Sequence, residues 1–171
     1  MRILIVEDDF ASRKFMMNFM SAYGDCDGTV DGMEAVEAYM MALEDEQPYD
    51  LICLDVMMPV MDGLECCRRI KNELLTSHIP VLMLTSCSMD EQRAQGYDSG
   101  ADGYLSKPFS SAVLKSRCAS LIANRKRIRE LWSSSLPAGG RKQERPTPGP
   151  NAPAGDPDNE FYNRFLALFQ G

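Results

Sequence analysis

Carboxylates, a hydroxyl and an ammonium follow four short apolar runs of the sequence, at the point where each run ends. In chain order, these polar residues are Glu7, Asp8, Asp9, Asp55, Thr85 and Lys107. Clustered carboxylates repel one another, and a cation that prefers oxygen ligands, such as Mg²⁺, would relieve that repulsion. A carboxylate beside Mg²⁺ can attack a phosphoryl group, while an ammonium and a hydroxyl stabilise the phosphoryl oxygens. The residue types therefore predict phosphoryl transfer to an aspartate, with Mg²⁺ as the cofactor.

These residues can meet only if the apolar runs are strands of one sheet. Runs at 2–6, 50–54, 80–84 and 103–105 are typical of buried strands, and a weaker run at 25–30 suggests an edge strand. Amphipathic spacing predicts helices at 11–23, 32–45, 64–75, 89–98 and 111–131, the last capped by Ser110. This order predicts an α/β fold, a doubly wound (βα)5 unit with a five-stranded parallel sheet. In such sheets ligands bind beyond the carboxyl ends of the strands.

The apolar side chains of the helices are expected to form the core. The predicted helix at 64–75 would bury a stripe made of Leu64, Cys67, Ile70 and Leu74. The twelve methionines, including Met16–Met17 and Met40–Met41, are interpreted as core residues. His78 precedes Ile79–Pro80 and is interpreted as an exposed turn histidine.

Four motifs resemble the signatures of two-component response regulator receiver domains, which are chemotaxis-regulator-like. The segment Asp55-Val56-Met57-Met58-Pro59-Val60-Met61-Asp62-Gly63 resembles the phosphoacceptor loop, and Glu7–Asp8 followed by Arg13 resembles the acidic pair. Thr85–Ser86 and Lys107–Pro108 resemble the other two signatures, at similar spacings. Asp9 leaves the acidic pair ambiguous by one place, and we choose Glu7–Asp8 because Arg13 then follows the second acid by five residues. The resemblance covers residues 1–125.

The resemblance implies a flavodoxin-like fold and a role for each matching residue. Asp55 would accept a phosphoryl group from a sensor histidine kinase or a phosphotransfer protein. Asp8 would ligate Mg²⁺ directly, with Glu7 nearby or acting through water, and Asp55 and the backbone carbonyl of Met57 would complete the metal site. Lys107, with a cis bond to Pro108, would contact the phosphoryl group, and Thr85 and Tyr104 would form the switch. The outcome would be changed binding of a downstream protein, with a phosphorylation-dependent dimer as one form.

Other interpretations of the same residues stay open at this stage. The acids after the first strand could serve only a helix N-terminus, and Thr85 could serve only as a helix cap. The main alternative function is a Mg²⁺-dependent aspartyl-phosphate phosphohydrolase. Those enzymes carry a second Asp two residues after the nucleophile, where this chain has Met57. We therefore predict a phosphoacceptor rather than an enzyme.

Length, charge and cysteine content limit the class of protein. The net charge is −7, and residues 1–120 carry 20 acids against 10 Lys and Arg, which argues against binding of nucleic acid. The six cysteines form no CxxC pair, which favours reduced thiols. The chain has no apolar run of membrane-spanning length and no secretory signal, so we expect a cytoplasmic protein without a membrane partner.

Composition divides the 171 residues into four parts. We assign residues 1–125 to the receiver domain and 126–136 to the extended end of its last helix. Residues 137–159 contain six Pro and four Gly, which indicates a linker. Residues 160–171 form a short amphipathic tail whose role the sequence leaves open, as it does whether an output domain follows.

Overall fold

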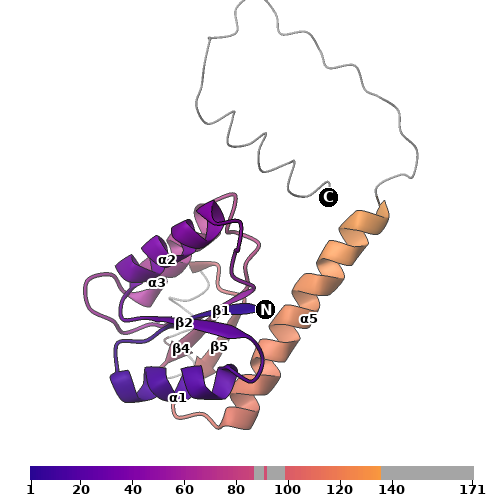
Figure 1. Cartoon of the computed structure of the whole chain (residues 1–171). Helices are drawn as coiled ribbons and strands as arrows, with labels where there is room; N and C mark the ends of the chain where they lie inside the picture. The colour runs from indigo at the N-terminus through magenta and orange to yellow at the C-terminus, as the bar shows by residue number, and fades with distance from the viewer. Residues whose placement is uncertain (87–90, 92–98, 136–171) are drawn as a thin grey trace, which may run out of the picture. The chain divides into compact units, whose positions relative to one another are not determined.

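A five-stranded parallel sheet forms the centre of the molecule (Figure 1). The computed structural model describes residues 1–86, 91 and 99–135, and of residues 132–135 only the backbone. The strands are β1 (Arg2–Val6), β2 (Asp25–Thr29), β3 (Leu51–Asp55), β4 (Val81–Thr85) and β5 (Gly103–Ser106). Their order in the sheet is β2-β1-β3-β4-β5, with every pair parallel. The predicted doubly wound parallel sheet is confirmed, including the edge position of β2.

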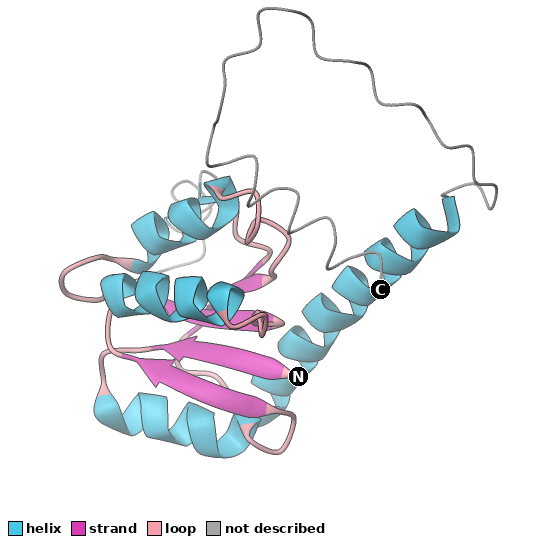
Figure 2. Ribbon diagram, turned by 45° about the horizontal axis from the view of Figure 1, so that its top comes forward, coloured by secondary structure: helices cyan, strands magenta, loops and turns pink. Residues whose placement is uncertain are grey.

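Helices cover both faces of this sheet (Figure 2). The described helices are α1 (Phe10–Met20), α2 (Gly32–Glu44), α3 (Gly63–Asn72) and α5 (Ser111–Ser135). An Asp side chain accepts a hydrogen bond from a first-turn N–H group in the first three of them, at Asp9, Asp31 and Asp62. Ser110 does the same for α5, since its hydroxyl accepts from Val113 N–H at 3.3 Å.

Alternate residues of the central strands supply two separate cores. Leu4 and Val6 of β1 pack on one side of the sheet with buried residues of α2 and α3. Ile3 and Ile5 pack on the other side with buried residues of α1 and α5. Because helices cover both faces of β1, residues 3–6 of this strand are all apolar. Polar residues can therefore occur only where the strand ends.

The ends of three helices differ from the prediction. The structure ends α3 at Asn72, because the backbone of Glu73 is extended (ψ 126°), and in the turn that follows the Thr76 hydroxyl donates to the Ile70 carbonyl. Leu74 lies in that turn and is 67% exposed, so its predicted place in the buried stripe was wrong. Helix α1 ends three residues earlier than predicted, and α5 continues to Ser135.

The predicted burial of the methionines is correct for part of the set and wrong for the five that are exposed within the described residues, which are Met1, Met33, Met40, Met41 and Met57. The buried members are Met16, Met20, Met61 and Met83. In α2 the inner face is occupied by Ala35, Tyr39 and Ala42, at helical spacing. Met40 and Met41 therefore fall on the outer side of the helix, where they are 42% and 63% exposed.

Several other predictions concern turns, thiols and the remaining segments. His78 lies exposed in the turn that follows α3, as predicted. The five cysteines in the described part of the chain are free thiols.

Of the helices in the described ranges, none combines the length and apolar character that crossing a bilayer requires. The predicted helix at 89–98, apart from residue 91, and the segments 137–159 and 160–171 lie outside the described residues.

Candidate functional site

The C-terminal ends of β1, β3, β4 and β5 lie at the same end of the sheet. Strand register pairs Val6 with Leu54, Asp55 with Leu84, and Thr85 with Ser106. The residues that directly follow or end these strands are thereby brought side by side. Because β1 and β3 are central, the acids at their ends lie next to well-packed apolar residues rather than in open loops.

Three carboxylates form a compact group at this end of the sheet. One carboxylate oxygen from each of Glu7, Asp8 and Asp55 lies within 4.8 Å of the other two. Glu7 is 1% exposed and Asp55 is 4% exposed, whereas Asp8 is exposed. Oxygen atoms at such spacing can share one divalent cation, and the exposed Asp8 leaves the group accessible from solvent.

Lys107 supplies the positive charge in this group. Its Nζ atom lies 2.6 Å from Glu7 Oε2 and 3.4 Å from Asp55 Oδ1. Its backbone N–H donates to the Thr85 carbonyl at 2.7 Å, and its peptide bond to Pro108 is cis, as predicted. Burial lowers the pKa of Lys107, but the hydrogen bond to Glu7 and the charges of Asp55 and Glu7 outweigh it and raise the pKa overall. The lysine is thus held as an ammonium.

The pKa of Glu7 is raised, and burial is the largest cause. The hydrogen bond from Lys107 opposes this shift, and the negative charge of Asp55 adds to it. Glu7 is therefore a carboxylate that the fold holds in an environment unfavourable to its own charge. An additional positive charge in the group would offset that cost.

Asp9 caps a helix, whereas Glu7 and Asp8 belong to the carboxylate group. Its carboxylate accepts from Ser12 N–H at 2.7 Å and caps α1, and this hydrogen bond lowers the pKa of Asp9. Arg13 donates to the backbone carbonyls of Glu7 at 2.7 Å and Asp8 at 3.2 Å. The guanidinium thereby fixes the chain that carries Glu7 and Asp8, a role that sequence reasoning did not assign to it. The structure thus places Glu7 and Asp8, and not Asp9, beside Asp55.

The loop after β3 returns to the sheet through Gly63. A Cβ atom at this position would stand 2.0 Å from the Asp55 carbonyl oxygen, so only glycine allows α3 to start so close to the strand end. Gly63 N–H also donates to the Val56 carbonyl at 3.0 Å. Sequence reasoning missed this supporting role, although the glycine was visible at the end of the loop motif. Met57 lies in the same loop and is 65% exposed.

Thr85 and Tyr104 lie on the two strands beside the carboxylate group. Thr85 ends β4 and is fully buried. Tyr104 is partly buried against the α2 and α3 side of the core, and its hydroxyl lies 3.3 Å from the Ser99 hydroxyl. Glu7, Asp8, Asp55 and Lys107 therefore form the centre of the site, with Thr85 ending the adjacent strand and Tyr104 farther along β5.

Comparison with known proteins identifies a matching family model and similar curated proteins. Residues 3–119 match the family model described as the response regulator receiver domain. The chain is 40% identical over 128 residues to the DNA-binding dual master transcriptional regulator RpaA of Synechocystis sp., covering 74% of this chain and 51% of that protein. It is 38% identical to the response regulator MprA of Mycobacterium avium, covering 74% and 53%.

A solved structure with a bound metal is similar as well. It is the receiver domain of a sensor histidine kinase from Pseudomonas aeruginosa, with a magnesium ion coordinated in the active site cleft. The TM-score is 0.63 at 27% identity, with 71% of this chain and 97% of that chain covered. The chain spans about half the length of the curated relatives RpaA and MprA. With the family model matched over most of its described residues, the chain belongs to the response regulator receiver domain family.

Proposed function

We propose that this protein is a phosphorylation-activated switch of a two-component system, with Asp55 as the phosphoacceptor. The observation that carries the proposal is the grouping of three carboxylates within 4.8 Å, with Lys107 Nζ 3.4 Å from Asp55. The phosphoryl donor is a sensor histidine kinase or a phosphotransfer protein. The changed charge at Asp55 alters binding of a downstream protein, and dimerisation on phosphorylation is one form of that response.

Mg²⁺ is the cofactor that the residues fit. Glu7, Asp8 and Asp55 offer hard oxygen ligands, and the Met57 backbone carbonyl completes the proposed set. The raised pKa of buried Glu7 also favours a site that receives positive charge. When bound, the ion neutralises the carboxylates and the phosphoryl oxygens, which allows two negative groups to approach each other.

The protein's own residues then have separate tasks in the transfer. An Asp55 carboxylate oxygen forms the new bond to phosphorus while the bond from phosphorus to the donor breaks. The Lys107 ammonium stabilises the equatorial oxygens and releases part of its interaction with Glu7 to do so. The Thr85 hydroxyl moves toward the bound phosphoryl group and forms a hydrogen bond with it. Tyr104 then turns inward into the space that Thr85 leaves.

A mass measurement after incubation with acetyl phosphate and Mg²⁺ tests this function. One phosphoryl group, about 80 Da, is expected on the protein, and none on Asp55→Asn or after chelation of the metal. Asp62→Asn serves as a matched control, because Asp62 caps α3 and lies outside the carboxylate group. Labelling that persists in Asp55→Asn contradicts the assignment of the phosphoacceptor.

The phosphohydrolase alternative lacks a supporting observation. Its general acid would occupy position 57, where the methionine side chain has no acidic group. In the same incubation a hydrolase releases free phosphate over many turnovers without accumulating the labelled protein, which distinguishes the two functions.

A further inference from the structure

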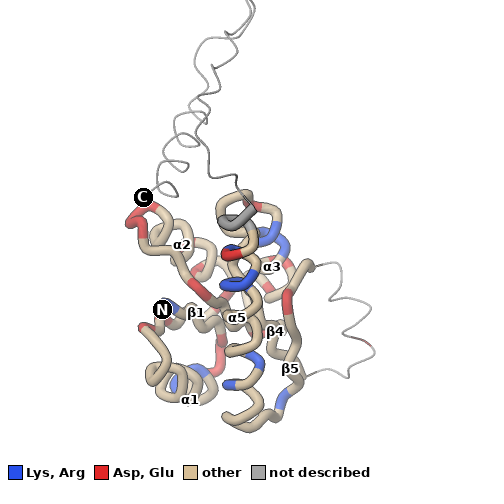
Figure 3. The backbone as a smooth tube through the Cα atoms, turned by 90° about the vertical axis from the view of Figure 1, so that its right-hand side faces the viewer, with Lys and Arg blue, Asp and Glu red and all other residues tan. Residues whose placement is uncertain are grey.

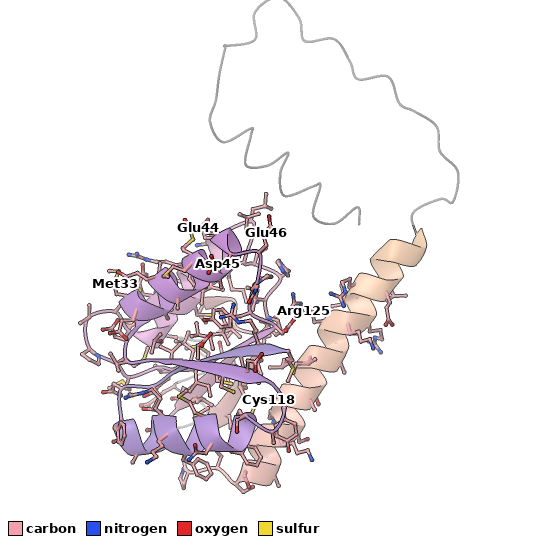
Figure 4. The ribbon with its side chains drawn as sticks, in the orientation of Figure 1. Met33, Glu44, Asp45, Glu46, Cys118 and Arg125 are labelled. Atoms are coloured by element: carbon pink, nitrogen blue, oxygen red, sulfur yellow. The ribbon has the colours of Figure 1, made fainter. Side chains whose placement is uncertain are left out.

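The outer side of α2 combines exposed methionines with acidic residues. We call the set Met33, Glu37, Met40, Met41, Glu44, Asp45 and Glu46 the α2 surface. The three methionines are 40%, 42% and 63% exposed, and all four acids are exposed. The spacing from Met33 through Glu37 and Met40 to Glu44 places these residues along one stripe of the helix. Figure 4 shows Met33 near one end of α2 and Glu44, Asp45 and Glu46 at the other.

The core does not account for these methionines. The inner face of α2 already packs through Ala35, Tyr39 and Ala42, and these side chains are at most 3% exposed. Met40 and Met41 occupy positions at which a helix in water would ordinarily carry polar side chains. Methionine is flexible and polarisable, and it adapts to the irregular apolar surface of a bound partner. An exposed methionine stripe is thus suited to contact another protein segment.

The charge around the stripe has a single sign. Residues 15–67 contain twelve Asp or Glu and no Lys, Arg or His. Figure 3 accordingly shows acidic residues and no basic ones on α2. Within the described residues, Glu37, Glu44, Asp45 and Glu46 take part in no ion pair. These carboxylates are therefore available to a positively charged partner, and α2 itself carries no cation that would repel it.

We infer that the α2 surface binds a basic amphipathic helix of a partner protein. Such a helix carries Lys or Arg beside apolar side chains at helical spacing, so its apolar stripe contacts the methionines and its cations pair with the flanking acids. Charge complementarity favours this occupant over an acidic segment, nucleic acid or an anionic lipid surface, all of which the acids would repel. The surface uses no residue of the phosphoryl site, so the inference is independent of Asp55.

The experiment uses the full chain and a fluorescent synthetic helix as the probe. The probe is a peptide of about 18 residues in which Leu and Lys follow helical spacing, and the control peptide has Gln in place of each Leu. Fluorescence anisotropy measures the dissociation constant at low and at moderate salt. The Leu peptide is expected to bind at least tenfold more tightly than the Gln peptide, since only the first can cover the methionines.

Two triple variants divide the apolar contribution from the electrostatic one. Met33→Gln with Met40→Gln and Met41→Gln is expected to weaken binding about tenfold at both salt concentrations. Glu37→Gln with Glu44→Gln and Glu46→Gln is expected to weaken it about tenfold at low salt and less at moderate salt. The single variant Met41→Gln, at the most exposed methionine of the α2 surface, is expected to weaken binding in the same direction with minimal effect on folding.

A charge control removes three acids elsewhere on the domain, two of them exposed and one, Glu65, partly buried and paired with arginines of α3. These changes are Asp25→Asn, Glu65→Gln and Glu73→Gln, which are expected to alter binding less than twofold. Equal weakening by this control, or unchanged binding by the methionine variant, would overturn the inference. Sedimentation of the free protein provides the last outcome, because self-association that Met41→Gln abolishes would identify a second copy of this chain as the occupant and reject a partner helix.

Discussion

Glu7 illustrates how one residue can be unfavourable for folding and useful for the site. Its carboxylate is buried beside Asp55, and it is compensated by Lys107 and by a longer hydrogen bond from the Asp9 backbone N–H. A glutamine of similar size would satisfy the same space without the charge. The fold therefore retains a charge that binding of a cation can use, at a cost in stability without the cation.

We predict that Glu7→Gln stabilises the magnesium-free protein at neutral pH, by about 1 kcal/mol. The sign follows from the raised pKa of Glu7: burial makes the folded state bind the proton more tightly, so ionisation costs stability as pH rises through that pKa. The gain over wild type should shrink as pH falls toward the ordinary pKa of glutamate, where both side chains are neutral. Urea denaturation at several pH values measures it, and a gain that grows on acidification would contradict the argument.

Val60 is a second residue at odds with its local environment. Its φ is +66° and its side chain is 82% exposed, although β-branched residues rarely adopt this left-handed backbone. The strained conformation costs about 1–2 kcal/mol for an L-residue, and the exposed side chain regains little by packing.

We predict that Val60→Gly stabilises the protein by about 0.5–1 kcal/mol, since relief of strain exceeds the entropy that glycine adds to the unfolded chain. Val113→Gly is the matched control, because this valine is also exposed but lies in α5. There the same change should destabilise by about 0.5 kcal/mol. Denaturant midpoints compare the two variants, and a loss of stability in both would show that Val60 carries no strain.

At the scale of elements, Arg125 attaches α5 to the start of β3. Its Nη1 atom donates to the Asp50 carbonyl at 3.1 Å and to the Tyr49 carbonyl at 3.5 Å, and it lies 3.3 Å from Asp50 Oδ1. The Arg125 side chain is 19% exposed, whereas residues 126–131 of α5 are exposed. Arg125 thus connects this part of α5 to the segment before β3 through three polar contacts.

We predict that Arg125→Ala destabilises the domain by about 1 kcal/mol, chiefly because the Tyr49 and Asp50 carbonyls lose the hydrogen bonds that Arg125 donates. Amide hydrogen exchange should accelerate in residues 121–131, since this part of α5 loses the Arg125 hydrogen bonds, and remain unchanged in β1 and β3. Arg127→Ala, at an exposed position of the same helix, should leave both quantities unchanged. Similar exchange in the two variants would contradict the role given to Arg125.

The parts that sequence reasoning could predict are those that periodicity and strand ends determine. Asp55 and Lys107 were placed together correctly because parallel strands converge at one edge whatever the details of packing. Helix ends were less predictable. The turn that follows α3 includes a hydrogen bond from the Thr76 hydroxyl to the Ile70 carbonyl, which the spacing of apolar residues does not reveal. Whether Met40 and Met41 are buried depends on which side of α2 faces the sheet. That side carries Ala35 and Tyr39, so the two methionines point away from it.

At the scale of the whole molecule, the net charge differs between the two parts of the chain. Residues 1–120 have a net charge of −10, and residues 121–171 have +3. The carboxylate group and the α2 surface both belong to the acidic part. The acidic character therefore serves cation binding at one place and, in our inference, a basic partner at another, without either depending on the other.

We predict that the protein truncated after Ser135 folds with the same denaturation midpoint as the full chain and accepts one phosphoryl group at the same rate. Both cores draw their buried residues from positions 3–118, and the Pro- and Gly-rich composition of 137–159 favours a linker over a packed segment. Truncation after Asn124 should lower the midpoint, because it removes Arg125 while leaving the cores intact. Thermal and urea denaturation of the three lengths measure this. A lower midpoint after removal of residues 136–171 alone would show that the tail stabilises the receiver domain, and the proposed boundary would then have to move beyond residue 136.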